Sequence, residues 1–117
     1  MDNRPMVSFC MSTYKRPDQL KKQVQEVLGQ TFTDFEIIIS DNDPASSGRE
    51  AAASFNDSRV KYFANEVNLG MVKSFNKSLA RSTGHYIAML ADDDPVYPEM
   101  LSVLLKLKEE YPGYGVY

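Results

Sequence analysis

The chain has 117 residues, of which 43% are hydrophobic and 25% are charged, and its formal net charge is −3. This composition is typical of one globular domain with a hydrophobic core, and it excludes a disordered chain. Lysine and arginine are scattered rather than clustered, so nucleic acid is not expected as a partner. No apolar run has the length of a membrane span and no signal peptide is evident. We therefore expect no transmembrane segment and a cytoplasmic location, with attachment to the inner face of the membrane as the alternative.

Strands and helices are predicted to alternate from the N-terminus. Residues 6–11 form an apolar run of strand length, and a helix follows that has Pro17 near its first position and apolar residues at helical spacing. Residues 35–40 are almost continuously apolar and β-branched, which is typical of a strand covered on both faces in a parallel sheet. The exit from this strand, residues 41–48, is a polar loop.

The second part of the chain repeats the pattern. Helices are expected over residues 49–55, 71–82 and about 98–110, a strand over residues 60–63 and a loop over residues 65–70. In the second of these helices, Val72, Phe75 and Leu79 share one face. Strands that alternate with helices predict an α/β fold, an open and mainly parallel Rossmann-like sheet with flanking helices.

Residues 84–95 are the stretch around which the chain is organised. An apolar run that we predict to be a buried central strand begins after Gly84 and ends in Asp92, Asp93 and Asp94. Three adjacent carboxylates repel one another unless a cation or hydrogen-bond donors compensate them. A hard divalent ion is a natural partner because it prefers oxygen ligands. A solvated acidic turn before Pro95 is the alternative.

The expected strand ends place polar residues at one edge of the sheet. Ligands of open parallel sheets bind beyond the carboxyl ends of the strands, which here are residues 12–14, 41–43 and 92–94. The ring of Tyr14 can stack on a base, Asp41 can accept a hydrogen bond from a base N–H, and the acidic turn can hold a metal on a diphosphate. These residues predict a nucleoside diphosphate site. A packed strand-end aromatic is the alternative for Tyr14.

Taken together, the motifs resemble the family 2 glycosyltransferases of the GT-A (nucleotide-diphospho-sugar transferase) fold, over essentially the whole chain. Residues 7–17 are similar to the opening strand and Pro-Thr-Tyr-Asn-Arg motif of the family, although Ser12 replaces the proline and Lys15 the asparagine. Residues 30–41 are similar to the second strand with its nucleobase-binding aspartate, and residues 84–94 to the strand that carries the Asp-x-Asp signature.

The resemblance implies a donor site in this chain. The substrate-binding candidates that it gives are Thr13, Tyr14, Arg16, Asp41, Asn68, Gly70, Lys73 and Asp92. Ala91 stands where many members have the first carboxylate, so Asp93 becomes the ligand for Mg²⁺ or Mn²⁺ and Asp92 faces the ribose. For Lys73 a phosphate contact is the functional interpretation, and a solvated helix position is the alternative.

The resemblance also implies an activity. Members of the family transfer a sugar from a nucleotide-diphosphate donor, here expected to be a UDP-sugar, to an acceptor hydroxyl on a sugar, a lipid-linked molecule or a protein, generally with inversion. Residues 1–117 are expected to be the nucleotide-sugar-binding portion of an enzyme of polysaccharide biosynthesis, truncated before its acceptor half, and no residue is assigned as the catalytic base. A non-catalytic binding module and a receiver-like signalling domain are the alternatives. Apolar surface left uncovered by the missing half predicts a homodimer.

Overall fold

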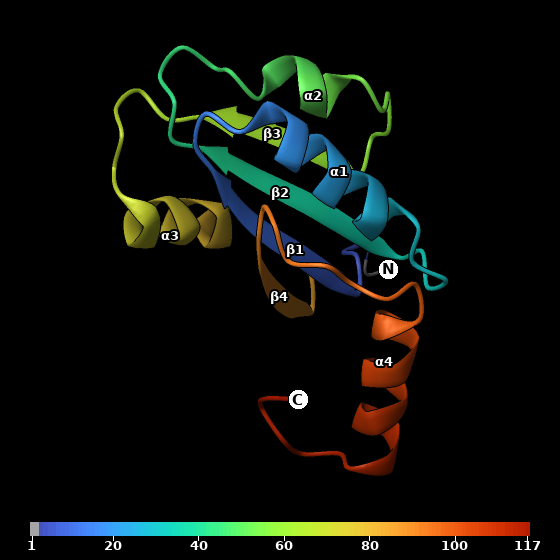
Figure 1. Ribbon diagram of the computed structural model, residues 1–117. Coiled ribbons are helices and arrows are strands. Elements are labelled where there is room, and N and C mark those ends of the chain that lie inside the picture. The colour runs from blue at the N-terminus through green and yellow to red at the C-terminus, as the bar shows by residue number, and fades with distance from the viewer. Residues whose placement is uncertain (1–2) are drawn as a thin grey trace.

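The structure, a computed structural model, describes residues 3–117, so the first two residues of the predicted domain lie outside the described part. Helices and strands alternate along the chain, as the sequence predicts (Figure 1). They are β1 (Val7–Thr13), α1 (Pro17–Leu28), β2 (Phe35–Asp41), α2 (Arg49–Ala53), β3 (Val60–Ala64), α3 (Met71–Arg81), β4 (Tyr86–Ala91) and α4 (Met100–Glu110). None of the helices in this part of the chain has the length and apolar character that crossing a bilayer requires.

The strands form one open sheet in the order β3-β2-β1-β4, and every pair is parallel. The predicted α/β fold with an open parallel sheet is therefore confirmed. In the register of the sheet, Thr13 lies beside Asp41 and Ser12 lies beside Ala91. Because all strands run the same way, the loops after β1, β2, β3 and β4 meet at a single edge of the sheet.

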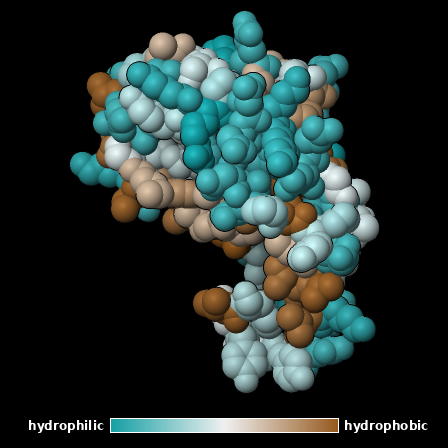
Figure 2. Space-filling model, viewed as in Figure 1, coloured by the Kyte–Doolittle hydropathy of each residue, from teal (hydrophilic) through white to brown (hydrophobic). Residues whose placement is uncertain are grey.

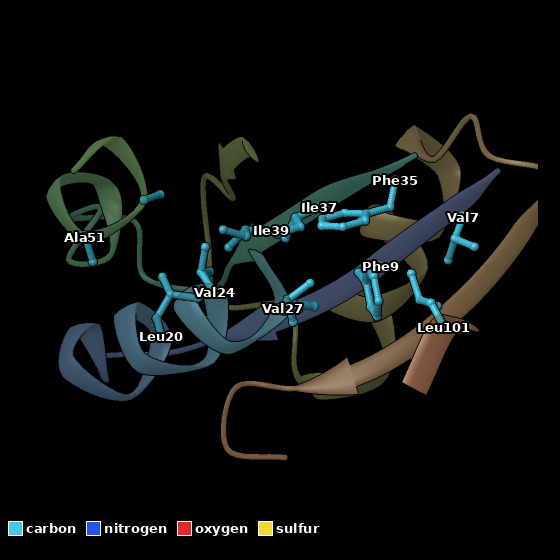
Figure 3. Packing of buried hydrophobic residues seen from close by; sticks show 12 residues of the cluster. Val7, Phe9, Leu20, Val24, Val27, Phe35, Ile37, Ile39, Ala51 and Leu101 are labelled. Carbon is cyan, nitrogen blue, oxygen red and sulfur yellow. The ribbon is translucent and has the colours of Figure 1, made fainter. Parts of the chain in front are cut away.

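The main hydrophobic core lies between α1 and one face of the sheet (Figure 3). Pro17 begins α1 with a backbone angle suited to a helix, and the spacing of Leu20, Val24 and Val27 gives the helix one apolar face. These side chains are fully buried against the apolar residues of β1 and β2. Phe9 and Phe35 add an edge-to-face ring contact with centroids 5.4 Å apart. The core therefore fixes α1 against the two central strands.

Serines, rather than apolar residues, line the contact between α3 and the other face of the sheet. Ser12 in β1 donates a hydrogen bond to Ser74 at 2.6 Å, and Ser74 donates to the hydroxyl of Ser40 in β2 at 2.9 Å. Ser74 and Ser78 are the buried residues of α3. Small side chains let the helix lie close to the sheet while their hydroxyl groups stay hydrogen-bonded.

The apolar face predicted for α3 does not pack on the sheet. Val72 has an exposed fraction of 73% and Leu79 one of 43%, whereas Phe75 is half-buried, so most of this face points away from the buried serines. The hydropathy pattern identified the helix correctly but could not identify its packed side, because serine carries no apolar signal. In Figure 2, hydrophilic side chains cover α1 and α2, while hydrophobic ones gather toward α4.

The prediction that residues 84–91 form a buried central strand is wrong in one respect. Within the described residues β4 pairs only with β1, and it forms an edge of the sheet. Alternate side chains of β4 are exposed, Ile87 at 40% and Met89 at 49%, because α3 covers β1 and β2 instead. A continuous apolar run does not distinguish an edge strand from a central one. The predicted homodimer stays a prediction.

A buried carboxylate joins the elements near the amino ends of the strands. Glu36 in β2 accepts hydrogen bonds from the Ser8 hydroxyl at 2.6 Å, the Thr83 N–H at 2.7 Å and the Lys61 ammonium at 2.7 Å. Burial raises the pKa of the Glu36 carboxyl, but the donors of Lys61, Ser8 and Thr83 outweigh burial and hold this pKa below its ordinary value. A Cβ atom at Gly84 would lie 2.6 Å from the Ser8 hydroxyl, so only glycine fits beside this network.

We expect Glu36→Gln to lower the free energy of unfolding near neutral pH by about 1–3 kcal/mol, because a neutral amide cannot satisfy the same donors. The lowered pKa means that folding favours the ionised form of Glu36. Its contribution is therefore complete above the unfolded-state pKa of about 4.3 and is lost as the pH falls through the folded-state pKa. Urea unfolding of both proteins near neutral pH and in acid measures this difference.

Glu109→Gln is the matched control, because Glu109 lies exposed on α4 and loses the same charge. We expect its unfolding free energy to stay within about 0.5 kcal/mol of the wild type. A Glu36→Gln protein as stable as this control near neutral pH would contradict a stabilising role for the network.

Candidate functional site

A hollow of about 350 Å³ lies at the edge where the carboxyl ends of the strands meet. Residues from the ends of β1, β2 and β4 and from the loop before α3 line it together. They are Ser12, Thr13, Tyr14, Arg16, Asn42, Asn68, Gly70, Met71 and Asp92. The structure thus brings together most of the predicted substrate-binding residues. A larger hollow of about 450 Å³ between β4 and α4 is mainly apolar, and it lies away from these polar groups.

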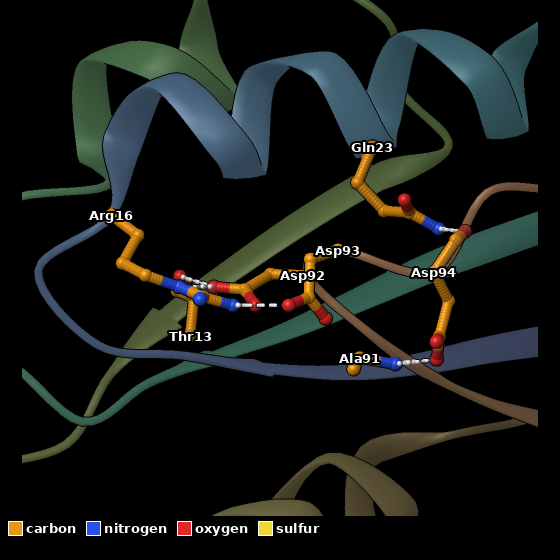
Figure 4. A network of polar contacts seen from close by, with 7 residues as sticks. All are labelled: Thr13, Arg16, Gln23, Ala91, Asp92, Asp93 and Asp94. Carbon is orange, nitrogen blue, oxygen red and sulfur yellow. Dashed lines mark hydrogen bonds and ion pairs between the residues drawn. The ribbon is translucent and has the colours of Figure 1, made fainter.

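Thr13 and Arg16 hold the first carboxylate of the acidic turn (Figure 4). Asp92 has an exposed fraction of 4%, and its Oδ2 accepts hydrogen bonds from the Thr13 hydroxyl at 2.9 Å and from Arg16 Nε at 3.1 Å. A terminal nitrogen of Arg16 bonds to the other oxygen of Asp92, which makes the pair bidentate. The hydrogen bond with Asp92, followed by its charge, raises the pKa of Arg16 above the ordinary value. Asp92 is therefore a fixed side chain that links β4 to β1.

The other two carboxylates of the turn have different surroundings. Asp93 is half exposed, and its Oδ2 lies 3.3 Å from a terminal nitrogen of Arg16. Asp94 accepts a hydrogen bond from the Ala91 N–H at 2.8 Å, and its main-chain oxygen accepts from Gln23 in α1 at 2.5 Å (Figure 4). These hydrogen bonds of Asp94 thus stabilise the conformation of the turn. Asp93 is accessible from solvent and, unlike Asp94, lies beside Arg16.

The side chains of the acidic turn fit a divalent ion only if a substrate supplies further ligands. In residues 3–117 there is no cluster of three or more His, Cys, Asp or Glu side chains arranged to hold a metal. Mg²⁺ in phosphate-transfer sites is commonly bound by one or two carboxylates together with phosphate oxygens and water. Asp93 has the exposure for this kind of site, whereas Asp92 is already paired with Arg16.

Asp41 does not line the hollow, which differs from the prediction that it contacts the base. Its side chain is fully buried and accepts hydrogen bonds from the Asp43 N–H at 2.9 Å and the Gly48 N–H at 3.0 Å. The Tyr62 hydroxyl also donates to it. Burial, followed by this hydrogen bond, raises the pKa of Tyr62. Asp41 therefore organises the loop after β2, and its carboxylate does not line the hollow.

Asn42 takes the position in the hollow that the sequence analysis gave to Asp41. Its Oδ1 accepts hydrogen bonds from the Asn65 side chain at 3.0 Å and the Leu69 N–H at 3.2 Å, and its Nδ2 donates to the Gly70 oxygen at 3.1 Å. Side chains alternate between the two faces of a strand, so Asp41 shares the face of the buried core and Asn42 does not. This alternation was the available signal, and the continuous apolar run of β2 concealed it.

Gly70 begins α3 in a conformation that favours glycine. Its φ is +82°, and its N–H donates to the side chain of Asn68 at 2.9 Å. Tyr14 has an exposed fraction of 42%, which argues against the packed aromatic, and Lys15 Nζ lies 5.2 Å from its ring centroid. Lys73 is exposed in the first turn of α3 and does not line the hollow. The contact of Lys73 with phosphate stays a prediction.

Solved structures of glycosyltransferases share this fold. The structure of TarS residues 1–349 from S. aureus in complex with UDP-GlcNAc superposes with a TM-score of 0.81 at 19% identity, covering 95% of this chain and 36% of TarS 1–349. The mannosyltransferase PcManGT from Pyrobaculum calidifontis in complex with GDP-Man and Mn²⁺ gives a TM-score of 0.75 at 15% identity, covering 90% of this chain and 32% of PcManGT. At these identities the likeness shows the fold alone.

Sequence comparison gives the family. The E. coli UDP-Glc:α-D-GlcNAc-diphosphoundecaprenol β-1,3-glucosyltransferase WfgD is 32% identical over 89 residues, which cover 76% of this chain and 35% of WfgD. The chain thus spans about a third of the length of this relative. The sequence profile of glycosyl transferase family 2 matches residues 8–117. Since this match covers nearly the whole chain, the protein belongs to glycosyl transferase family 2.

Proposed function

We propose that residues 1–117 form the donor-binding portion of a metal-dependent glycosyltransferase that uses a nucleotide-diphospho-sugar, most simply a UDP-sugar. The observation that carries this proposal is the arrangement of the hollow. The exposed ring of Tyr14 and the side-chain amide of Asn42 line the hollow. The half-exposed carboxylate of Asp93 lies next to it, beside Arg16, which does line the hollow. The base, ribose and diphosphate of a nucleotide sugar carry chemical groups that are complementary to these side chains.

Tyr14 and Asn42 are suited to the base. A half-exposed ring offers a stacking face, and stacking accepts any base. The Asn42 amide uses both lone pairs of Oδ1 and one N–H within the chain, which leaves one N–H for a ligand. A single donor matches a carbonyl oxygen of uracil. In this proposal specificity for uracil therefore depends on Asn42, and Asp41 stabilises the loop after β2 through its hydrogen bonds to the main chain.

Asp93 and the start of α3 are suited to the diphosphate. Mg²⁺ or Mn²⁺ held by Asp93 would act as a Lewis acid that stabilises the diphosphate leaving group. Thr13 and Arg16 fix Asp92 at the end of β4. In this proposal Asp92 accepts a hydrogen bond from a ribose hydroxyl. Gly70 and Asn68 shape the backbone where α3 begins, and Lys73 in the first turn is the candidate for a longer-range phosphate contact.

The acceptor and the stereochemical outcome are further parts of the proposal. WfgD is named for a reaction with a diphosphoundecaprenol-linked sugar, which supports a lipid-linked sugar as the acceptor here. Such an acceptor fits a role in polysaccharide biosynthesis at the cytoplasmic face of a membrane. An inverting reaction needs a base that deprotonates the acceptor hydroxyl. We assign no residue of this chain as that base. An assay of sugar transfer from UDP-sugars to a lipid-linked acceptor by the full-length protein tests the proposed acceptor.

We expect Asn42→Ala to weaken UDP binding about tenfold, because the variant loses one hydrogen bond to the base. Isothermal titration of UDP into the protein in the presence of Mn²⁺ measures the change, and GDP and dTDP provide the base comparison. Asn76→Ala is the matched control, since Asn76 is exposed on α3 and does not line the hollow. Equal UDP affinity in the two variants would show that Asn42 does not contact the base.

We expect Asp93→Asn to abolish the gain in UDP affinity that Mn²⁺ produces, while metal-free UDP binding stays within about twofold of the wild type. The reason is that an amide is a weaker metal ligand than a carboxylate. The same titration with and without Mn²⁺ measures both quantities, and Asp18→Asn, on the exposed first turn of α1, is the control. Undiminished metal dependence in Asp93→Asn would remove Asp93 from the metal site.

A further inference from the structure

Arg16 is the cationic partner of the acidic turn in the described part of the chain. Its guanidinium holds Asp92 through two of its nitrogens, and one of these also lies 3.3 Å from Asp93 Oδ2. The same nitrogen thus touches both the fixed carboxylate and the accessible one. Neither carboxylate forms an ion pair with a lysine within residues 3–117. Arg16 therefore offsets one of the three negative charges of the turn before any ligand binds.

We propose that Arg16 is a built-in counter-ion that makes divalent metal binding at Asp93 depend on the diphosphate. The inference rests on the proposed function, because it concerns the order in which metal and nucleotide occupy that site. In the nucleotide-free protein the positive charge of Arg16 neutralises part of the negative charge that would attract the metal. The divalent ion therefore binds weakly to Asp93 when no nucleotide is present. A diphosphate supplies the negative charge that accommodates both cations.

The charges of the site support this coupling. The three carboxylates of the turn and Arg16 together carry a formal net charge of −2, against −3 without the arginine, so Arg16 weakens the attraction of the turn for a divalent ion. An ion at Asp93 would also lie beside the guanidinium nitrogen that contacts this carboxylate, and two cations at that separation repel each other. The diphosphate adds several negative charges and oxygen ligands. Metal and nucleotide should therefore bind with positive coupling, and each should raise the affinity of the other by the same factor.

The geometry also explains why arginine suits this position. A guanidinium can hold Asp92 with two nitrogens and still contact Asp93, whereas the ammonium group of lysine is a single point charge. The guanidinium stays positively charged at all physiological pH values, so the repulsion between Arg16 and a metal ion does not change with pH in this range. The Arg16 side chain is 45% exposed, which leaves room for it to turn toward a phosphate. The hydrogen bond from Thr13 to Asp92 does not involve Arg16.

The test is the affinity for Mn²⁺ alone, measured from the electron paramagnetic resonance signal of the free ion. We expect Arg16→Gln to bind Mn²⁺ about tenfold more tightly than the wild type in the absence of nucleotide, because the repelling charge is gone. Arg16→Lys, which keeps the charge, should stay close to the wild type. Lys22→Gln, which removes an exposed charge on α1, is the control for net charge. Thermal melting of each variant establishes that it is folded.

A second arm repeats the Mn²⁺ titration with saturating UDP. The wild type should gain affinity for Mn²⁺ strongly on adding UDP, and the gain should be about tenfold smaller in Arg16→Gln. Equal or weaker binding of Mn²⁺ alone to Arg16→Gln would overturn the inference while leaving the proposed function intact. A wild type that binds Mn²⁺ as tightly without UDP as with it would overturn the inference without any variant. Absence of UDP binding would instead refute the proposed function, and the titrations with Mn²⁺ alone would still test Arg16.

Discussion

The contact between Thr13 and Asp92 is the constraint on which the candidate site depends. It joins the carboxyl ends of β1 and β4, two strands that lie far apart in the sequence and side by side in the sheet. Arg16 strengthens this connection from the loop after β1. Once Asp92 is fixed, the next residue, Asp93, faces solvent at the same edge as Tyr14 and Asn42. The arrangement of the hollow is thus a consequence of parallel strand pairing closed by one buried carboxylate.

The two faces of the sheet position this edge in different ways. On one face, apolar packing fixes α1, and Gln23 of this helix holds the acidic turn through the main chain of Asp94. On the other face, hydroxyl groups connect α3 to the strands, and Ser74 lies between Ser12 and Ser40. Asn42 and Asn65 continue these polar contacts into the loop before α3. Packing sets the position of the strands, whereas directional hydrogen bonds set the loops that line the hollow.

The sequence predicted the architecture well because the helical spacing of apolar residues, the apolar runs of strand length and the turn residues agree along the chain. The alternation of elements, the parallel sheet and the acidic strand end were all predicted correctly. Two of the errors share one cause, because a continuous apolar run indicates burial but not which side of the strand, or which place in the sheet, is buried. It hid that Asp41 points into the core and Asn42 toward the hollow, and it made β4 resemble a central strand. The buried side of α3 was missed because Ser74 and Ser78 pack through hydroxyl groups.

The network of Glu36 lies at the edge of the sheet opposite the hollow, where Ser8 and Thr83 tie the strand entrances together. The Glu36 network, which secures the strand entrances, is therefore separated from the residues that line the hollow by the length of the strands. Substitutions in the loop before α3 act on side chains such as Asn68 without touching this network. Such a division lets substitutions around the hollow change what it binds while the stability that the Glu36 network provides is preserved.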